Sequence, residues 1–167
     1  MPSRTLPAVR RLSFSDLQAF PDLFVDVANR DPGALSYYAG DWGNADTRRA
    51  IADRVAQQPA DREALADALL DHNAHWSRDG GVPEQVAQNI ETLRDPESVA
   101  VVTGQQVGFL SGPLYTIYKT ITTLQLVEEL AEETGRPVVP VFWVEGEDHD
   151  FEEIAHASIL HRNEVVD

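Results

Sequence analysis

The sequence contains no cysteine among its 167 residues. Disulfide bonds, thiolate metal sites and a cysteine nucleophile are therefore excluded for this chain. The lack of cysteine agrees with a reducing compartment, so we expect a cytoplasmic location. With 43% hydrophobic and 25% charged residues, the composition is that of an ordinary globular protein, and the length suits one domain with a sizeable core.

Positive charge is also scarce. Only one of the 13 basic residues is a lysine, Lys119, and the formal net charge is −15. A surface that is acidic on average disfavours binding to the nucleic-acid backbone or to an anionic membrane. No apolar run approaches the roughly 18 residues of a membrane-spanning helix, and the first residues lack the apolar stretch of a signal peptide. We therefore expect neither a nucleic acid nor a membrane as a partner.

Residues 1–95 are predicted to form an N-terminal arm and a helical region that packs on the remainder. Asn44 or Asp46 is a candidate cap for a helix that ends near residue 57. Asp61 starts a further helix to about residue 76, and Pro83 suits the first turn of one that ends near residue 93. None of these segments carries a motif that indicates chemistry.

The hydrophobic pattern changes near residue 96. Residues 98–103 form a continuous apolar run that is typical of a strand buried on both faces of a parallel sheet, and residues 138–144 form a second. Between them, Pro113 opens a helix to about residue 134 that Gly135 closes. This order predicts a right-handed β-α-β crossover, the unit of doubly wound nucleotide-binding folds.

Residues 96–167 are accordingly predicted to be the first part of a Rossmann-like core. A third strand is expected near residues 157–160, and the sequence stops before a helix and further strands that would cover it. Three parallel strands make a poor sheet, so we expect the chain to be an N-terminal piece of a larger fold. The apolar face of the central helix is predicted to consist of Leu114, Ile117, Ile121, Leu124, Val127 and Ala131.

Two polar segments follow the two strands directly and define a candidate site. Thr103-Gly-Gln-Gln-Val-Gly108 is expected to be a loop, and Glu145-Gly-Glu-Asp-His-Asp150 follows the second strand. The carboxyl ends of adjacent parallel strands share one edge of the sheet, where ligands bind in such folds. Gln105 and Gln106 offer amide donors and acceptors, and the helix start at Gly112 favours an anion. The glycine spacing fits neither the dinucleotide fingerprint nor a Walker loop, and glycines that merely turn a strand into a helix are the alternative.

Three side chains at the start of the central helix are candidates for ligand binding, and for each of them a purely structural role is the alternative. Lys119 lies in the second turn, away from the predicted apolar face, and is either a solvated surface lysine or part of the site. Tyr115 and Tyr118 either line the loop or simply pack.

His149 stands in an acidic segment, residues 145–153. Crowded carboxylates repel one another, which leaves three functions open. They are a divalent-metal site, a general acid or base at His149 oriented by Asp148 or Asp150, and acceptors for a substrate amine or hydroxyl. The spacing matches no known metal-ligand motif, so we assign no metal ligand. A solvated acidic loop is the structural alternative.

Four motifs together resemble the cysteine-adding enzyme of bacillithiol biosynthesis, the cysteine ligase family BshC. They are Thr103-Gly-Gln-Gln-Val-Gly108, Gly112-Pro-Leu-Tyr-Thr-Ile-Tyr-Lys119, Pro140-Val-Phe-Trp-Val144 and Glu147-Asp-His-Asp-Phe-Glu-Glu153. Their order and spacing make the match specific. The resemblance covers most of this chain and only the front of the family's longer sequence.

The resemblance implies an α/β fold in which a helical segment precedes an incomplete Rossmann-like parallel sheet, similar to the core of class I aminoacyl-tRNA synthetases. Residues 112–118 resemble the synthetase signature, with Tyr115 and Tyr118 at its histidine positions and Ile117 at its glycine position. Adenylation by a histidine pair therefore does not carry over, and ATP or another nucleotide stays open as a cofactor.

The implied reaction joins the carboxyl group of L-cysteine to the amine of glucosaminyl-malate, a step in making a low-molecular-weight thiol. The family also implies a homodimer for the full-length protein. Under this hypothesis, His149 with Asp148 or Asp150 is catalytic. We expect the 167-residue fragment to be inactive alone. A non-catalytic module that binds a nucleotide or a sugar phosphate is the alternative. The residues expected to bind substrate are Thr103, Gly104, Gln105, Gln106, Gly112, Tyr115, Tyr118, Lys119 and Glu147.

Overall fold

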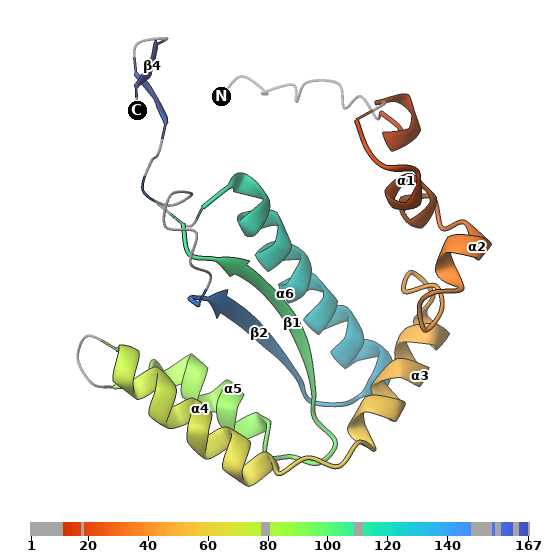
Figure 1. Cartoon of the computed structure of the whole chain (residues 1–167). Coiled ribbons are helices and arrows are strands. Elements are labelled where there is room, and N and C mark those ends of the chain that lie inside the picture. Colours follow the sequence, from red (N-terminus) through yellow and green to blue (C-terminus); the bar gives the residue numbers. More distant parts are fainter. Residues whose placement is uncertain are drawn as a thin grey trace, which may run out of the picture. The chain divides into compact units, whose positions relative to one another are not determined.

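The chain forms two compact units, Met1–Arg48 and Arg49–Asp167, in a computed structural model (Figure 1). The boundary between them falls within helix α3, Ala45–Ala56. The structure describes residues 12–17, 19–77, 81–108, 112–147, 155, 158–161 and 164–166.

The first unit is built from short helical elements. A 3-10 turn, η1 (Phe14–Asp16), precedes helices α1 (Asp22–Ala28) and α2 (Pro32–Leu35). An aromatic cluster of Phe14, Phe20 and Phe24 joins η1 to α1, with ring centroids 4.8 to 5.2 Å apart. The helix α3 then begins after Asn44, whose side chain accepts hydrogen bonds from the backbone of Asp46 and Thr47. Of the two caps considered for this helix, Asn44 is therefore the one used.

The second unit contains three further helices whose ends follow local sequence signals. They are α4 (Arg62–Trp76), α5 (Glu84–Thr92) and α6 (Leu114–Thr134). Asp61 caps α4 through a 3.0 Å hydrogen bond from the backbone N–H of Ala64. Gly135 ends α6 in a left-handed conformation with φ of 69°, which an L side chain rarely adopts. The predictions of α4 and of α6 with its glycine stop are confirmed.

A two-stranded parallel sheet lies at the centre of this unit. Strands β1 (Val99–Gln106) and β2 (Val138–Glu145) pair in register from Val99 beside Val138 to Gln106 beside Glu145. This confirms the two predicted strands and their parallel pairing. The prediction that Thr103–Gly108 forms a loop is wrong for its first four residues, because pairing with β2 keeps the backbone extended through Gln106.

The expected third parallel strand is also corrected. Strand β3 (Ile159–His161) pairs antiparallel with β4 (Glu164–Val166) in a separate two-stranded sheet. The pairing partner is the segment that follows immediately in the chain, so this hairpin adds no strand to the β1–β2 sheet.

Helix α6 packs along one face of the sheet and contacts both strands, while α5 contacts β2 (Figure 1). The core of the unit is formed by Val99 of β1, Leu130 of α6 and Ala52 of α3, each at most 9% exposed. Val139 of β2 is 2% exposed. Among the described helices, none has both the length and the apolar character required to cross a bilayer.

The face of α6 that meets the sheet is lined by threonine rather than by the predicted apolar residues. Thr116, Thr123 and Leu130 are the buried side chains of this helix, whereas the predicted Leu114 and Ile117 are 62% and 48% exposed. The hydroxyl of Thr123 donates to the carbonyl oxygen of Lys119 at 2.9 Å, and Thr120 and Thr134 do the same one turn back. At Thr123 the hydroxyl is satisfied inside the helix, so this side chain can pack on the sheet through its methyl group.

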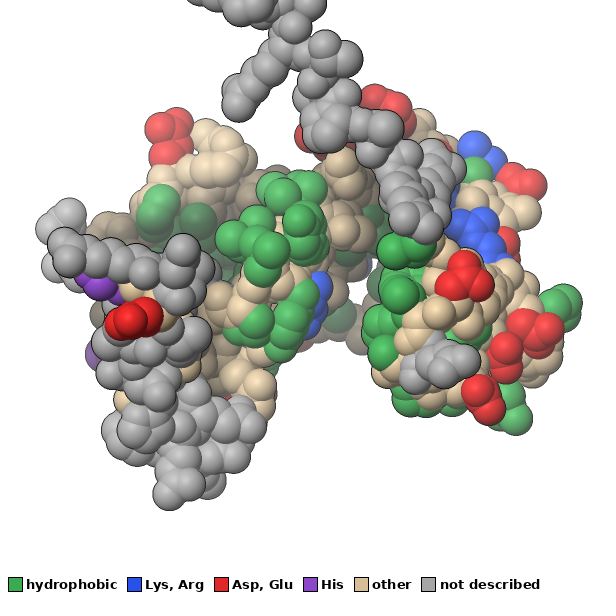
Figure 2. Space-filling view, turned by 90° about the horizontal axis from the view of Figure 1, so that it is seen from above, with side chains coloured by type: hydrophobic (Ala, Val, Ile, Leu, Met, Phe, Trp, Pro, Cys, Tyr) green, Lys and Arg blue, Asp and Glu red, His purple; other side chains and the backbone are tan. Residues whose placement is uncertain are grey.

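Large apolar side chains are exposed where the strands end and α6 begins. They include Val102, Trp143 and Val144 of the strands, at 61 to 63% exposure. Figure 2 shows hydrophobic side chains gathered at this end of the second unit. An exposed apolar surface of this kind marks a place where a ligand or further protein packs.

Arg62 joins helix α4 to the start of the sheet. Its guanidinium donates to the carbonyl oxygen of Leu93 at 3.1 Å, to the hydroxyl of Ser98 at 2.9 Å and to the carbonyl oxygen of Ser98 at 3.1 Å. Ser98 is only 1% exposed, so water cannot replace these donors without local opening.

Replacing Arg62 with methionine is expected to lower the free energy of unfolding by about 2–3 kcal/mol, because buried acceptors lose their donors while the aliphatic stem is kept. Urea denaturation followed by circular dichroism measures the change. Arg54→Met, which removes an exposed arginine of α3, is the control and should change stability by less than about 0.5 kcal/mol. Equal stability of the two variants would contradict the role of Arg62.

Candidate functional site

The carboxyl ends of β1 and β2 lie side by side. Gly104 pairs with Trp143 and Gln106 pairs with Glu145, so both strands stop at the same edge of the sheet. The convergence inferred from the sequence is therefore present for the described residues. Asp148, His149 and Asp150 follow β2 and lie outside the described residues.

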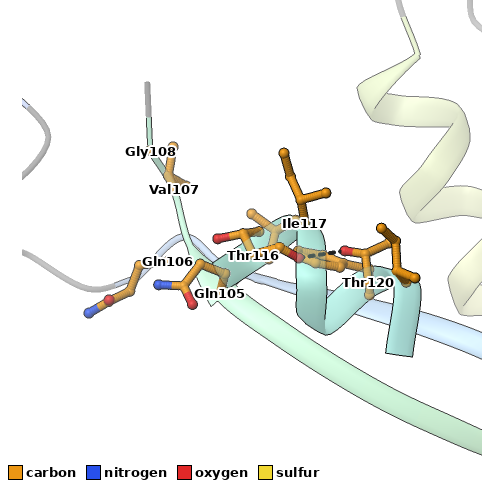
Figure 3. A pocket seen from close by; sticks show the side chains of 10 residues that line it. Gln105, Gln106, Val107, Gly108, Thr116, Ile117 and Thr120 are labelled. Atoms are coloured by element: carbon orange, nitrogen blue, oxygen red, sulfur yellow. Dashed lines mark hydrogen bonds between the residues drawn. The ribbon is translucent and has the colours of Figure 1, made fainter. Parts of the chain in front are cut away.

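A pocket of about 430 Å³ opens between this edge and the first two turns of α6. Figure 3 shows Gln105 and Gln106 extending from the end of β1, and Thr116, Ile117 and Thr120 from the helix. Phe142 and Val144 of β2 contribute apolar surface. Among the described residues, the lining consists of Gln105, Gln106, Val107, Gly108, Thr116, Ile117, Thr120, Ile121, Phe142 and Val144.

Gly104 is required where β1 and β2 approach each other closely. A Cβ atom at this position would lie 2.7 Å from the carbonyl oxygen of Trp143 and 3.1 Å from its Cβ. The glycine therefore serves the pairing of the strands, and Thr103 before it is a half-buried strand residue.

Lys119 is bound at the end of β1 and is not a free surface lysine. Its ammonium donates to the carbonyl oxygen of Gly104 and, over 3.2 Å, to Oε1 of Gln105. The same ammonium lies 5.5 Å from the centre of the Tyr115 ring, within the range of a cation–π interaction. Among the described residues no carboxylate forms an ion pair with Lys119.

The start of α6 has features that suit an anion. Gly112 has φ of 73°, and Pro113, the N-cap residue, provides no side-chain hydrogen bond to the first turn. Tyr115 and Tyr118, which occupy the two histidine positions of the synthetase signature, are 50% and 61% exposed. Neither tyrosine lines the pocket, so of the three aromatic or cationic candidates only Lys119 reaches the pocket wall, through Gln105.

Glu145, the last residue of β2, binds the backbone that follows the strand. Its carboxylate accepts one hydrogen bond from the indole N–H of Trp143 at 3.3 Å and one from the backbone N–H of Glu147 at 3.2 Å. Within the described ranges, no three histidine or acidic side chains stand close enough to hold a metal ion.

Thr116 is a pocket residue that sequence reasoning missed. It is 6% exposed, and within the described chain its hydroxyl oxygen has no hydrogen-bond partner although it is buried. Figure 3 shows this hydroxyl pointing toward the end of β1. The signal in the sequence was a pair of threonines, Thr116 and Thr120, one helical turn apart after Pro113. In the structure, only Thr120 donates its hydroxyl to the helix backbone, which leaves the hydroxyl of Thr116 without a partner among the described residues.

Two arginines with shifted pKa values lie away from the pocket. Hydrogen bonds from the guanidinium to Asp67, Glu91 and Glu63 raise the pKa of Arg94 above its usual value. Asp53 and Glu97 raise the pKa of Arg136 in the same way. Both side chains stay charged at any working pH. Arg94 therefore links α4 to the end of α5, and Arg136 links α3 to the segment before β1.

Comparison with known proteins bears directly on this arrangement. Residues 9–166 match the family described as bacillithiol biosynthesis BshC, N-terminal Rossmann-like domain. The chain belongs to this family. That result agrees with the observed order β1, α6, β2 and with the parallel pairing of the strands.

Individual relatives carry the same family name. A protein of Salinibacter ruber named as a cysteine ligase (BshC) is 61% identical over 99% of this chain. Proteins given that name in Halalkalibacterium halodurans and Symbiobacterium thermophilum are 50% and 39% identical over 60% and 83% of the chain. The BshC chain described here spans 30%, 18% and 27% of the lengths of these three relatives, respectively.

Proposed function

We propose that this chain forms part of the active site of a ligase that joins the carboxyl group of L-cysteine to the amine of glucosaminyl-malate. The observation that supports the proposal is the pocket at the carboxyl edge of β1 and β2, in a chain that belongs to the BshC family. The names of the relatives supply the reaction class, and the pocket supplies a place for a substrate.

The pocket is suited to an anionic group of the substrate. Gln105 and Gln106 bring amides to the wall, the start of α6 near Gly112 contributes the positive end of the helix dipole, and none of the described lining residues carries a carboxylate. The malate part of glucosaminyl-malate carries carboxylates. Phe142 and Val144 would lie against the uncharged part of the ligand.

His149 is proposed to accept the proton that the amine must lose before its nitrogen attacks the cysteine carbonyl. In the sequence it follows Glu145, the last residue of β2, by four positions, and β2 ends beside Gln106 of β1. Asp148 or Asp150 would orient the imidazole, and Glu147 would accept a hydrogen bond from substrate. Amide formation also requires activation of the cysteine carboxyl group, for which ATP or another nucleotide is the candidate class of co-reactant.

We also propose that the site lies where class I aminoacyl-tRNA synthetases have theirs. A nucleotide phosphate would suit the start of α6, where the wall contains the hydroxyl group of Thr116, which has no partner among the described residues. The exposed Tyr115 and Tyr118 do not reproduce the histidine pair, so activation would use other groups.

Calorimetric titration of the chain with glucosaminyl-malate tests the proposal. We expect binding that Gln105→Ala weakens about tenfold, since one charge-assisted hydrogen bond contributes about that much. Glu129→Gln, on the exposed side of α6, is the control and should leave affinity unchanged. Binding of ATP or ADP without binding of glucosaminyl-malate, and without an effect of Gln105→Ala, would instead favour the non-catalytic nucleotide-binding module.

The remaining proposals concern the whole protein. The 167 residues are proposed to be inactive alone, because they span under a third of the Salinibacter ruber relative and leave apolar surface exposed at the site. We also propose a cytoplasmic location and a homodimer for the full-length protein.

A further inference from the structure

The hydrogen bonds of Lys119 determine which way the Gln105 amide faces. An ammonium group only donates hydrogen bonds, so the atom of Gln105 that lies 3.2 Å from Nζ must be the carbonyl oxygen Oε1. A second bond to the carbonyl oxygen of Gly104 and the nearby Tyr115 ring hold the ammonium at the end of β1. Because Oε1 is engaged in this way, the other branch of the carboxamide, the NH₂ group, is the one left for a ligand.

The orientation of Gln105 determines the chemistry of the pocket wall. Gln105 lines the pocket, as does Thr116, whose buried hydroxyl has no partner among the described residues. Both groups can donate a hydrogen bond to the same ligand, and the charge of Lys119 lies directly behind the first of them. None of the described lining residues is an aspartate or a glutamate that would repel a negatively charged ligand.

We propose that Lys119 is a positioning residue that fixes the Gln105 carboxamide with its NH₂ group toward the pocket, so that Gln105 and Thr116 together bind a carboxylate. Lys119 itself does not touch the ligand in this arrangement. This inference rests on the proposed function, because it concerns the same pocket. It assigns to that pocket a class of ligand, a compact carboxylate. The carboxylate could belong to a malate-like group or to an amino acid such as cysteine.

The test compares carboxylate binding by the 167-residue chain and its variants, with L-malate and L-cysteine as separate probes and glucosamine as a probe without a carboxylate. We expect Lys119→Met to weaken binding of the preferred carboxylate about tenfold and Lys119→Arg, which keeps a donor-only cation, to recover most of the loss. Arg54→Met removes the same charge from α3 and should leave affinity unchanged. Circular dichroism verifies that each variant is folded.

A double-mutant cycle separates positioning from a direct charge effect. If Lys119 acts through Gln105, Lys119→Met should weaken binding by less than about twofold in a Gln105→Met background. In parallel, the side-chain NH₂ signals of Gln105 in ¹⁵N NMR spectra should shift on addition of the carboxylate and should change position in Lys119→Met.

Two results would overturn the proposal. The first is equal carboxylate affinity of the native chain and Lys119→Met. Failure of both proteins to bind either carboxylate counts as this result. The second is a tenfold loss from Lys119→Met that persists in the Gln105→Met background. Both readouts use carboxylate binding alone, so they are independent of whether the full-length protein forms the cysteine amide.

Discussion

Replacing Gly104 with alanine should lower the free energy of unfolding by about 3 kcal/mol and disrupt the pocket, because the new Cβ has no room. The atom would lie 2.7 Å from the backbone carbonyl oxygen of Trp143, a separation that real Cβ contacts do not show. Backbone atoms cannot rotate away as a flexible side chain can. The two strands must therefore separate at their carboxyl ends, where Gln105 begins the pocket wall.

Gly146→Ala is the matched control for this prediction. Gly146 follows β2 directly, and no atom of the described residues would lie within 4 Å of a Cβ placed on it. Its substitution should change stability by less than about 0.5 kcal/mol. Urea denaturation gives both values, and ¹⁵N NMR shifts of Gln105 and Gln106 show whether the strand ends have moved. Similar stability of the two alanine variants would contradict the close strand approach.

Replacing His149 with glutamine should lower kcat for cysteine ligation by about 10²- to 10⁴-fold, the usual contribution of a general base. Glutamine keeps hydrogen-bonding capacity and cannot accept the proton of the amine. The effect should fall mainly on kcat, since the proposed carboxylate contacts are made by Gln105 and Thr116.

The assay requires a BshC polypeptide of full family length that carries this sequence as its N-terminal part. Formation of the cysteine amide of glucosaminyl-malate is followed by mass spectrometry. His75→Gln, at an exposed position of α4, is the control and should leave the rate unchanged. A His149→Gln enzyme with native kcat would remove His149 from the proposed mechanism.

Much of the central unit could be predicted because its signals are local. The apolar runs indicated β1 and β2, and Gly135 marked the end of α6 through a backbone conformation that favours glycine. The extension of β1 through Gln106 could not be predicted, since it depends on pairing with residues about 40 positions later in the chain. These residues are polar, which is typical of a loop, and they are extended because they pair with β2.

The inner face of α6 was not predictable from hydrophobic periodicity. The buried Thr116 and Thr123 are one position away from the apolar Ile117 and Leu124, which are 48% and 47% exposed. Hydropathy favours isoleucine and leucine for burial, whereas the contact with the sheet selects the narrower threonine stripe. This rotation of the helix is also what brings Lys119 to Gly104 and Gln105.

NMR mapping of glucosaminyl-malate on the ¹⁵N-labelled chain shows directly whether this pocket binds the substrate. We expect the largest shifts on Gln105, Gln106, Thr116 and Thr120, at the carboxyl edge of the sheet and the start of α6. Shifts that are largest in α4 and α5, or in the unit Met1–Arg48, or no shifts at saturating ligand, would contradict the assignment of this pocket as the substrate site.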